Sequence, residues 1–350
     1  MGKLVTVQWL RGLAAIGVVW FHAMFLVVDN GLHSYQTEYG QIRFIGAIGV
    51  DVFFVISGFI ISVSAARNPS IGDFLRNRFL RIWPLYAVAT LAYLMIRPER
   101  YDLLGLGMSL VFLQPPGGTD VSPVLPPGWT LLFEAAFYAV VVAALLWRSQ
   151  RLLQERIAIL LAALVMVGCS YGLVRPLNIV GNPIVIEFLM GVLIGRTYSL
   201  GYRIPGWAAT SLFAVGAFLI LRDAMHGTSS TWMAETTLDG SLSWPRVGTW
   251  GLFSAMIVAS AALRQPVAEG VGRVLTFLGD ASYSIYLFHV HVVDWLFPRV
   301  SMLGPLDPDL IILIATAAAV ATGILAHLIL ERPLLRVVSM WKKRPTPIQA

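Results

Sequence analysis

The chain has 350 residues, of which 57% are hydrophobic and only 13% are charged, and its formal net charge is +6. A soluble domain of this size would carry about 25% charged residues, so the composition excludes an ordinary soluble enzyme. Many runs reach the roughly 17 to 25 apolar residues that cross a bilayer, which indicates an all-α, polytopic integral membrane protein. The positive charge does not point to nucleic acid, because basic residues collect in the cytoplasmic loops of such proteins.

We predict about ten membrane-crossing helices in one membrane domain, residues 1–340, followed by a basic cytoplasmic tail, residues 341–350. The predicted crossings are 4–28, 44–65, 81–97, 128–147, 156–174, 184–199, 206–222, 246–264, 276–298 and 309–330. The stretch 102–114 is apolar but short, so we expect it to be re-entrant or interfacial. With both termini in the cytoplasm, seventeen basic residues fall on the inner side and seven on the outer side, a bias that favours ten crossings over eleven.

The first predicted helix carries Arg11 and His22 in a run that is otherwise almost wholly apolar. A separation of eleven residues returns a helix to within about 20° of its starting direction, so both residues share one face, roughly 16 Å apart along the axis. A charge within the membrane costs at least a few kcal/mol unless it is paired or hydrated. This face therefore needs water or protein to contact.

Other predicted helices also place ionisable residues in the outer half of the membrane, namely Asp51, Glu134, Glu187 and His289. We interpret them, with His22, as one shared polar cavity that opens outward. The residues expected to line this cavity are Asp51, Trp129, Glu187, Tyr286 and His289.

A basic cluster, "FLRNRFLRIWPLY", lies on the inner side, just before the third predicted crossing. Arg78 and Arg81 are three residues apart and share a helix face, with Arg76 close by. Two guanidinium groups placed in this way match phosphate oxygens. The same arginines could instead anchor a helix end to anionic lipid headgroups.

An ordered set of motifs along nearly the whole chain resembles the membrane-bound acyltransferase family 3, which O-acylates bacterial polysaccharides. Besides Arg11 and His22, the motifs are "GVDVFFVISGFII", "RFLRIWPLY", "GWTLLFEAAFY", "EFLMGVLIG", "ASYSIYLFHV" and "ERP". The "PPGWTL" form is similar to the exopolysaccharide-production acetyltransferase subgroup. Many relatives append an SGNH domain after the last helix. Without one here, we expect the membrane domain to serve the acceptor alone or with a partner protein.

The resemblance implies a bacterial inner-membrane enzyme that takes acetyl-CoA from the cytoplasm and transfers the acetyl group to a hydroxyl of a surface or exported polysaccharide. The acceptor would be a glycan or a lipid-linked sugar, and no metal is expected. The residues assigned to donor binding are Arg11, Arg76, Arg78 and Arg81. His22 would be the general base, with Glu134 orienting it or stabilising its cation. Arg11 would neutralise CoA phosphate or organise the donor tunnel. A covalent acetyl-His22 relay stays open as a variant.

Other interpretations of the same residues are kept. A proton- or ion-coupled transporter also buries His, Glu and Arg, although the sequence shows no internal repeat that would favour one. A structural subunit of an export machine is a second alternative. His22 and Arg11 could form only structural bonds between helices, and Arg78 and Arg81 could only mark the inner side. A metal site is disfavoured, since no single predicted helix has metal-ligand spacing.

Overall fold

The computed structural model describes residues 4–31, 42–98, 103–113, 123–147, 151–172, 177–226, 234–264, 272–303 and 306–342. These residues form helices joined by short connections and contain no β-strand, only one isolated bridge between Ile204 and Arg264. Residues 343–350 of the predicted basic tail lie outside the described residues. The expected fold class, an almost wholly helical polytopic membrane protein, is confirmed.

The α-helices are α1 (Val5–Val28), α2 (Gly49–Arg67), α3 (Ile71–Leu94), α4 (Leu103–Leu110), α5 (Trp129–Leu145), α6 (Leu153–Tyr171), α7 (Leu177–Val180), α8 (Ile186–Ser199), α9 (Gly206–His226), α10 (Ala234–Leu238), α11 (Ser243–Arg246), α12 (Leu252–Leu263), α13 (Arg273–Leu296), α14 (Pro308–Ala326) and α15 (Arg332–Lys342). The 3₁₀-helices are η2 (Ile42–Ile48), η4 (Pro126–Gly128), η5 (Pro183–Val185) and η7 (Phe297–Leu303). Two π-helical turns, η6 (Val247–Gly251) and η8 (His327–Glu331), join helices into longer segments.

A helix occupies the position of each predicted crossing, but seven segments of the described chain are long and apolar enough by themselves to span a membrane. They are Val5–Val28, Ile45–Arg67, Pro126–Leu145, Leu153–Tyr171, Gly206–Met225, Ser243–Leu263 and Pro308–Val337. Of the other three helices, α8 has only 14 residues, α3 begins with the arginine cluster, and α13 carries two histidines and two aspartates. The number ten therefore stays a prediction.

The short stretch predicted to be re-entrant or interfacial contains α4, which has eight residues and would extend only about 12 Å. It lies against α3, where the Trp83 indole donates a 3.0 Å hydrogen bond to the Leu110 carbonyl and the Tyr86 and Ser109 hydroxyls are 2.9 Å apart. Leu103 on α4 is 89% exposed. This helix is too short to cross a bilayer.

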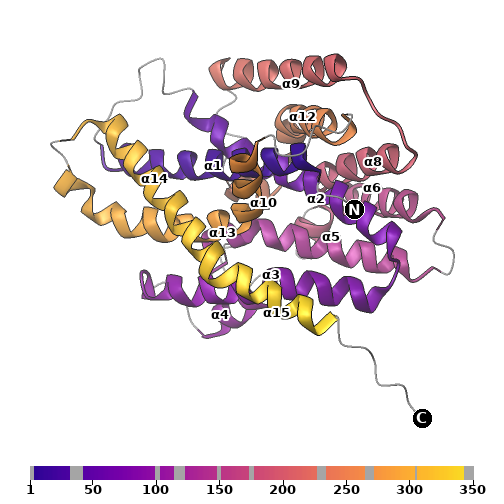
Figure 1. Cartoon of the computed structure of the whole chain (residues 1–350), viewed down its shortest axis with the longest axis horizontal. Helices are drawn as coiled ribbons and strands as arrows, with labels where there is room; N and C mark the ends of the chain where they lie inside the picture. Colours follow the sequence, from indigo (N-terminus) through magenta and orange to yellow (C-terminus); the bar gives the residue numbers. More distant parts are fainter. Residues whose placement is uncertain are drawn as a thin grey trace, which may run out of the picture.

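The helices pack closely where a glycine on one helix faces the backbone of its neighbour. α1 packs along α13, and α2 packs along α8. A Cβ on Gly279 of α13 would lie 2.1 Å from the Gln8 carbonyl oxygen of α1, and one on Gly58 of α2 would lie 2.1 Å from the Phe188 carbonyl oxygen of α8. Small residues let helix backbones approach in this way. Figure 1 shows α9 at one edge of the bundle, beyond α12, with α3, α4 and α15 at the opposite edge.

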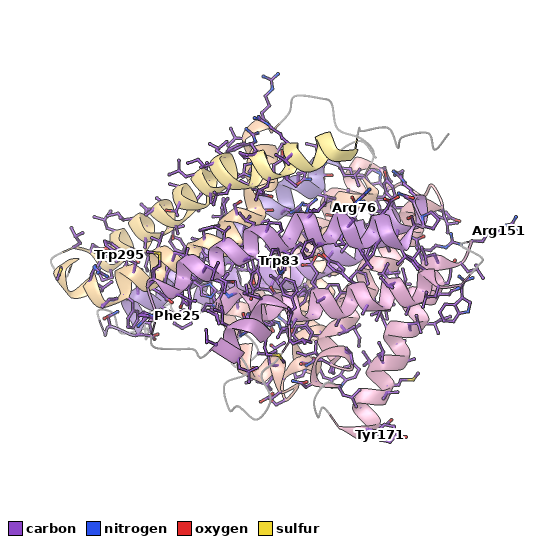
Figure 2. All side chains as sticks on the ribbon, turned by 90° about the horizontal axis from the view of Figure 1, so that it is seen from below. Phe25, Arg76, Trp83, Arg151, Tyr171 and Trp295 are labelled. Atoms are coloured by element: carbon purple, nitrogen blue, oxygen red, sulfur yellow. The ribbon has the colours of Figure 1, made fainter. Side chains whose placement is uncertain are left out.

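The two ends of the bundle carry different labelled residues in Figure 2, which places Arg76 and Arg151 toward one end and Phe25 and Trp295 toward the other. The count of basic residues assigns Arg76 and Arg151 to the inner side of the membrane. The same topology puts the end of the first crossing and of the ninth on the outer side. Figure 2 thus shows the two pairs toward opposite ends of the bundle, and which end faces the cytoplasm stays a prediction.

Candidate active site

A cavity with a volume of about 200 Å³ lies between α1, α2, α3, α5 and α13. It brings together five residues that the sequence singled out: Arg11, Arg78, Arg81, Glu134 and Tyr286. They come from four helices and from both ends of the sequence, so the site exists only in the folded bundle. We call this space the arginine cavity.

Positive charge dominates the arginine cavity. Arg11 from α1 is half-buried, and Arg78 and Arg81 from α3 line the same space. The Nε atom of Arg78 is buried and makes no hydrogen bond within the described chain. Among the described lining residues, Glu134 provides the one carboxylate. A cavity with three guanidinium groups and one carboxylate favours a ligand that carries several negative charges.

Glu134 is held by its neighbours within this cavity. Its Oε1 atom accepts a 2.5 Å hydrogen bond from the Tyr138 hydroxyl and a 3.4 Å hydrogen bond from the Ser57 hydroxyl. Sequence reasoning did not name Tyr138 or Ser57. The signal for Tyr138 was present, because a residue four positions after Glu134 shares its helix face. Ser57 comes from α2, and nothing in the sequence relates it to Glu134.

Tyr286 connects the arginine cavity to two histidines. Its hydroxyl lies 3.0 Å from the Thr130 hydroxyl and donates a 3.2 Å hydrogen bond to the Pro127 carbonyl. Its ring centroid lies 5.9 Å from those of Phe53 and His289. Tyr286 therefore lines the cavity on one side and contacts His289 on the other.

His22 and His289 form a pair beyond Tyr286, outside the lining of the arginine cavity. Their ring centroids are 4.8 Å apart. The Nδ1 atom of His22 lies 2.9 Å from the Val18 carbonyl oxygen, and that of His289 lies 2.7 Å from the Tyr286 carbonyl oxygen. A carbonyl oxygen only accepts, so Nδ1 carries the proton and each neutral ring keeps a lone pair on Nε2. A general base needs such a lone pair.

The match to known proteins covers the residues of both the cavity and the histidine pair. The model of acyltransferase family 3, described as an acyltransferase domain, matches residues 4–328. The chain belongs to acyltransferase family 3. This confirms the resemblance that the sequence motifs indicate.

Three curated proteins are similar to this family 3 acyltransferase along most of their length. Exopolysaccharide production protein ExoZ of Rhizobium meliloti (strain 1021) is 33% identical over 312 residues, which cover 83% of this chain and 90% of that protein. Acyltransferase MdmB of Streptomyces mycarofaciens is 25% identical over a region that covers 98% of this chain and 94% of that protein. Nodulation protein 10 of Rhizobium leguminosarum bv. viciae is 26% identical, covering 94% and 92%. No solved structure shows a significant match.

Asp51 and Glu187, expected in an outward cavity with His22, belong to a buried cluster around Arg246. Arg246 donates hydrogen bonds of 2.8 and 2.9 Å to the two Asp51 carboxylate oxygens, and both side chains are buried. Arg246 also donates to the Thr237 hydroxyl at 3.2 Å. Glu187 is fully buried nearby, against Gly251. Arg246 is the first residue of the predicted crossing 246–264 and was counted among the basic residues of the outer side; in the structure it is the buried partner that the Asp51 carboxylate requires.

Two further predicted residues, Arg76 and Trp129, do not line the arginine cavity, and a third, Glu134, lines it without a hydrogen bond to His22. Arg76 is exposed and donates a 2.8 Å hydrogen bond to Asp73. Trp129 packs its ring against Phe54 and Phe133. Glu134 has no recorded hydrogen bond to His22, whose ring is instead held by Val18. The expected orienting role of Glu134 therefore has no direct contact to support it.

The "ERP" motif contributes a buried hydrogen-bond network. Glu331 Oε2 accepts from the Ser284 hydroxyl at 2.6 Å and from His327 Nδ1 at 2.7 Å, and both Glu331 and His327 are buried. This network joins the π-helical turn η8 to α13. Within the described part of the acyltransferase, no three His, Cys, Asp or Glu side chains gather in a way that could hold a metal ion.

Proposed function

We propose that this family 3 acyltransferase takes an acetyl group from acetyl-CoA and transfers it to a sugar hydroxyl of a surface or exported polysaccharide, in the inner membrane of a bacterium. The observation that carries the proposal is the meeting of Arg11, Arg78 and Arg81 in one cavity lined by Tyr286, whose ring contacts that of His289, which in turn contacts that of His22. The similarity to an exopolysaccharide production protein supports a glycan acceptor.

The residues of the arginine cavity fit the phosphates of coenzyme A. Guanidinium groups bind phosphate oxygens in a bidentate manner, and the buried Nε of Arg78 has an unused hydrogen-bond donor. Arg81 is exposed and lies on the side that the basic-residue count assigns to the cytoplasm, where the donor is found. Arg78 and Arg81 would hold the phosphates, and Arg11 would hold the donor deeper in the bundle.

His22 would act as the general base. The Nε2 lone pair of His22 takes the proton from the acceptor hydroxyl, and the hydroxyl oxygen forms a bond to the thioester carbonyl carbon. The carbon–sulfur bond breaks, and His22 returns the proton to the thiolate that leaves. Removing such a base costs about 10²- to 10⁴-fold in rate. The axial offset of roughly 16 Å between Arg11 and His22 requires a long, thin donor arm, which pantetheine provides.

The test measures radiolabelled acetyl transferred from acetyl-CoA into membrane glycan by vesicles that contain the protein. We expect the wild type to label glycan, His22→Ala to lose at least 10²-fold in rate, and Arg78→Ala/Arg81→Ala to need much more donor. Arg203→Ala is the matched control, because Arg203 is an exposed arginine outside the lining of the arginine cavity, where it donates to the Tyr198 and Tyr202 carbonyls and lies over the Tyr198 ring.

The three measurements test the base, the donor site and the identity of the donor separately. If His22→Ala labels glycan as fast as the wild type, the base lies elsewhere, and Glu134 becomes the candidate. If the arginine variant has an unchanged donor requirement, the donor site is wrong. If the wild type transfers nothing and also fails to bind CoA, the acetyl-CoA proposal fails, and substrate flux through the same vesicles then tests the transporter alternative.

A further inference from the structure

His289 is a fully buried histidine on α13 that contacts the ring of His22 on α1. Its Nε2 atom is buried and has no hydrogen-bond partner among the described groups. A buried polar atom without a partner is destabilising, and native proteins retain few of them. The unpartnered nitrogen therefore requires a reason, and its position against His22 suggests one.

Each of the two rings is oriented by its own helix. His22 bonds through Nδ1 to Val18, one turn earlier on α1, and His289 bonds through Nδ1 to Tyr286, one turn earlier on α13. These bonds use the side of each ring that faces its own backbone. Each Nε2 therefore points away from its own helix, and α1 and α13 pack against each other.

The separation of the rings suits a direct hydrogen bond once one of them gains a proton. Two imidazoles joined by an N–H···N bond with a nitrogen separation of about 2.9 Å have centroids about 5 Å apart. The observed separation is 4.8 Å, with an angle of 62° between the ring planes. Two neutral rings with lone pairs on both Nε2 atoms cannot form this bond, because neither atom carries a hydrogen.

We infer that His289 is a positioning residue that accepts a hydrogen bond at Nε2 from His22 when His22 is protonated. This inference rests on the proposed role of His22 as the base. His22 Nε2 takes the proton of the acceptor hydroxyl and later returns it to the departing thiolate. Between these two events the new Nε2–H of His22 is shared between the reacting oxygen or sulfur and the His289 lone pair, which stabilises the His22 cation, and no proton or electron beyond those of the transfer is needed.

The other titratable groups around the pair already have partners. His291 on α13 bonds through Nε2 to the Ala89 carbonyl at 2.9 Å, and the Tyr93 hydroxyl donates to Asp294. Asp294 also interacts electrostatically with His22, and its negative charge favours the same cation. His289, whose ring contacts that of His22, thus carries at Nε2 an acceptor that no described group occupies.

Two substitutions at His289 separate a positioning role from a structural one. His289→Asn keeps an amide N–H where Nδ1 lies, and so keeps a donor for the Tyr286 carbonyl, but it removes the acceptor at the Nε2 position. His289→Gln loses the Nδ1 donor but places an amide oxygen near the Nε2 position. A purely structural histidine would be replaced better by asparagine, whereas a hydrogen-bond acceptor for His22 would be replaced better by glutamine.

We expect His289→Asn to lower kcat for acetyl transfer by about 10- to 100-fold, which is typical of removing a residue that supports a reacting group. Its KM for acetyl-CoA should stay within about two-fold of wild type, because the arginine cavity is untouched. His289→Gln should keep kcat within about five-fold of wild type. Equal losses in both variants, or an unimpaired His289→Asn, would overturn the inference.

A measurement without substrate keeps the inference testable if acetyl transfer itself is not found. The purified full-length protein, with nitrogen-15 in the imidazole rings of its six histidines, is titrated by NMR. On acidification the His289 Nε2 signal should move from the position of a free lone pair to that of a hydrogen-bonded nitrogen. His22→Asn should abolish this movement. A His289 signal that stays at the free position after His22 is protonated would overturn the inference, whatever the fate of the proposed reaction.

Discussion

Arg246 at the end of α11 donates a hydrogen bond to each carboxylate oxygen of Asp51 on α2, although the two residues are 195 positions apart in the sequence. The two side chains are 1% and 0% exposed. Arg246→Leu would leave the Asp51 carboxylate buried without its partner, which costs about 3–5 kcal/mol in stability. We expect the thermal unfolding midpoint of the detergent-solubilised protein to fall by several degrees.

The double variant Asp51→Leu/Arg246→Met is the informative control for this pair. It removes both charges, and apolar replacement of a buried ion pair is often close to neutral in stability. Its midpoint should therefore lie above that of Arg246→Leu alone. A double variant as unstable as the single one would show that the cluster around Glu187 needs a charge at this position for another reason.

Arg76 and Arg78 are two residues apart, yet they should differ in their effect on the donor. Arg78 lines the arginine cavity with an unused buried N–H, whereas Arg76 is exposed and paired with Asp73. Hydrogen bonds to charged groups are worth about 1.5–3 kcal/mol, so Arg78→Ala should raise KM for acetyl-CoA by about 10- to 100-fold. Arg76→Ala should change it by less than about two-fold, as expected for an exposed ion pair. Steady-state kinetics in vesicles checks both values, and equal effects would contradict the structural distinction.

Substitution of Glu134 by glutamine should strengthen the binding of CoA but slow acetyl transfer. Glu134 is the one carboxylate among the described residues that line the arginine cavity, so Glu134→Gln removes a negative charge from the space in which we propose that the CoA phosphates bind. Free CoA should bind about three- to ten-fold more tightly, since one repulsive interaction at intermediate dielectric is lost. Acetyl transfer should nevertheless slow, because the network with Tyr138 and Ser57 is altered. Calorimetry with CoA and the transfer assay measure the two effects, and weaker CoA binding would show that the carboxylate contacts the donor directly.

Hydropathy and residue spacing predicted much of the fold for clear physical reasons. Apolar runs of bilayer length predicted the long helices, whereas their orientation, which rests on the excess of basic residues on one side, stays a prediction. The shared face of Arg78 and Arg81 follows from helical periodicity, which also relates Glu134 to Tyr138. These are local properties, and a sequence records them directly.

The arrangement of the polar groups could not be predicted in the same way. The depth of a residue in the membrane follows from the topology. The direction in which its helix face points follows from packing, which the sequence does not record. Residues at similar depth were therefore grouped into one cavity. The structure separates them into the arginine cavity, the pair of His22 and His289, and the cluster of Asp51 with Arg246. The ion pair of Arg246 with Asp51 was not predicted, because a scale of hydropathy cannot register a partner on a distant helix.

Gly279 should be essential for bringing α13 against α1. A Cβ at this position would lie 2.1 Å from the Gln8 carbonyl oxygen, and Gln8 lines the arginine cavity. Gly279→Ala must push the two helices apart, and overpacking of this kind costs about 1–3 kcal/mol. Because α1 carries Arg11 and His22, acetyl transfer should fall by more than the loss of folded protein explains. Gly72→Ala is the matched control, since nothing lies within 4 Å of the added carbon and alanine favours the helix. Thermal unfolding and the transfer rate per folded molecule distinguish the outcomes, and a Gly279→Ala protein with wild-type rate would show that the α1–α13 contact does not set the site.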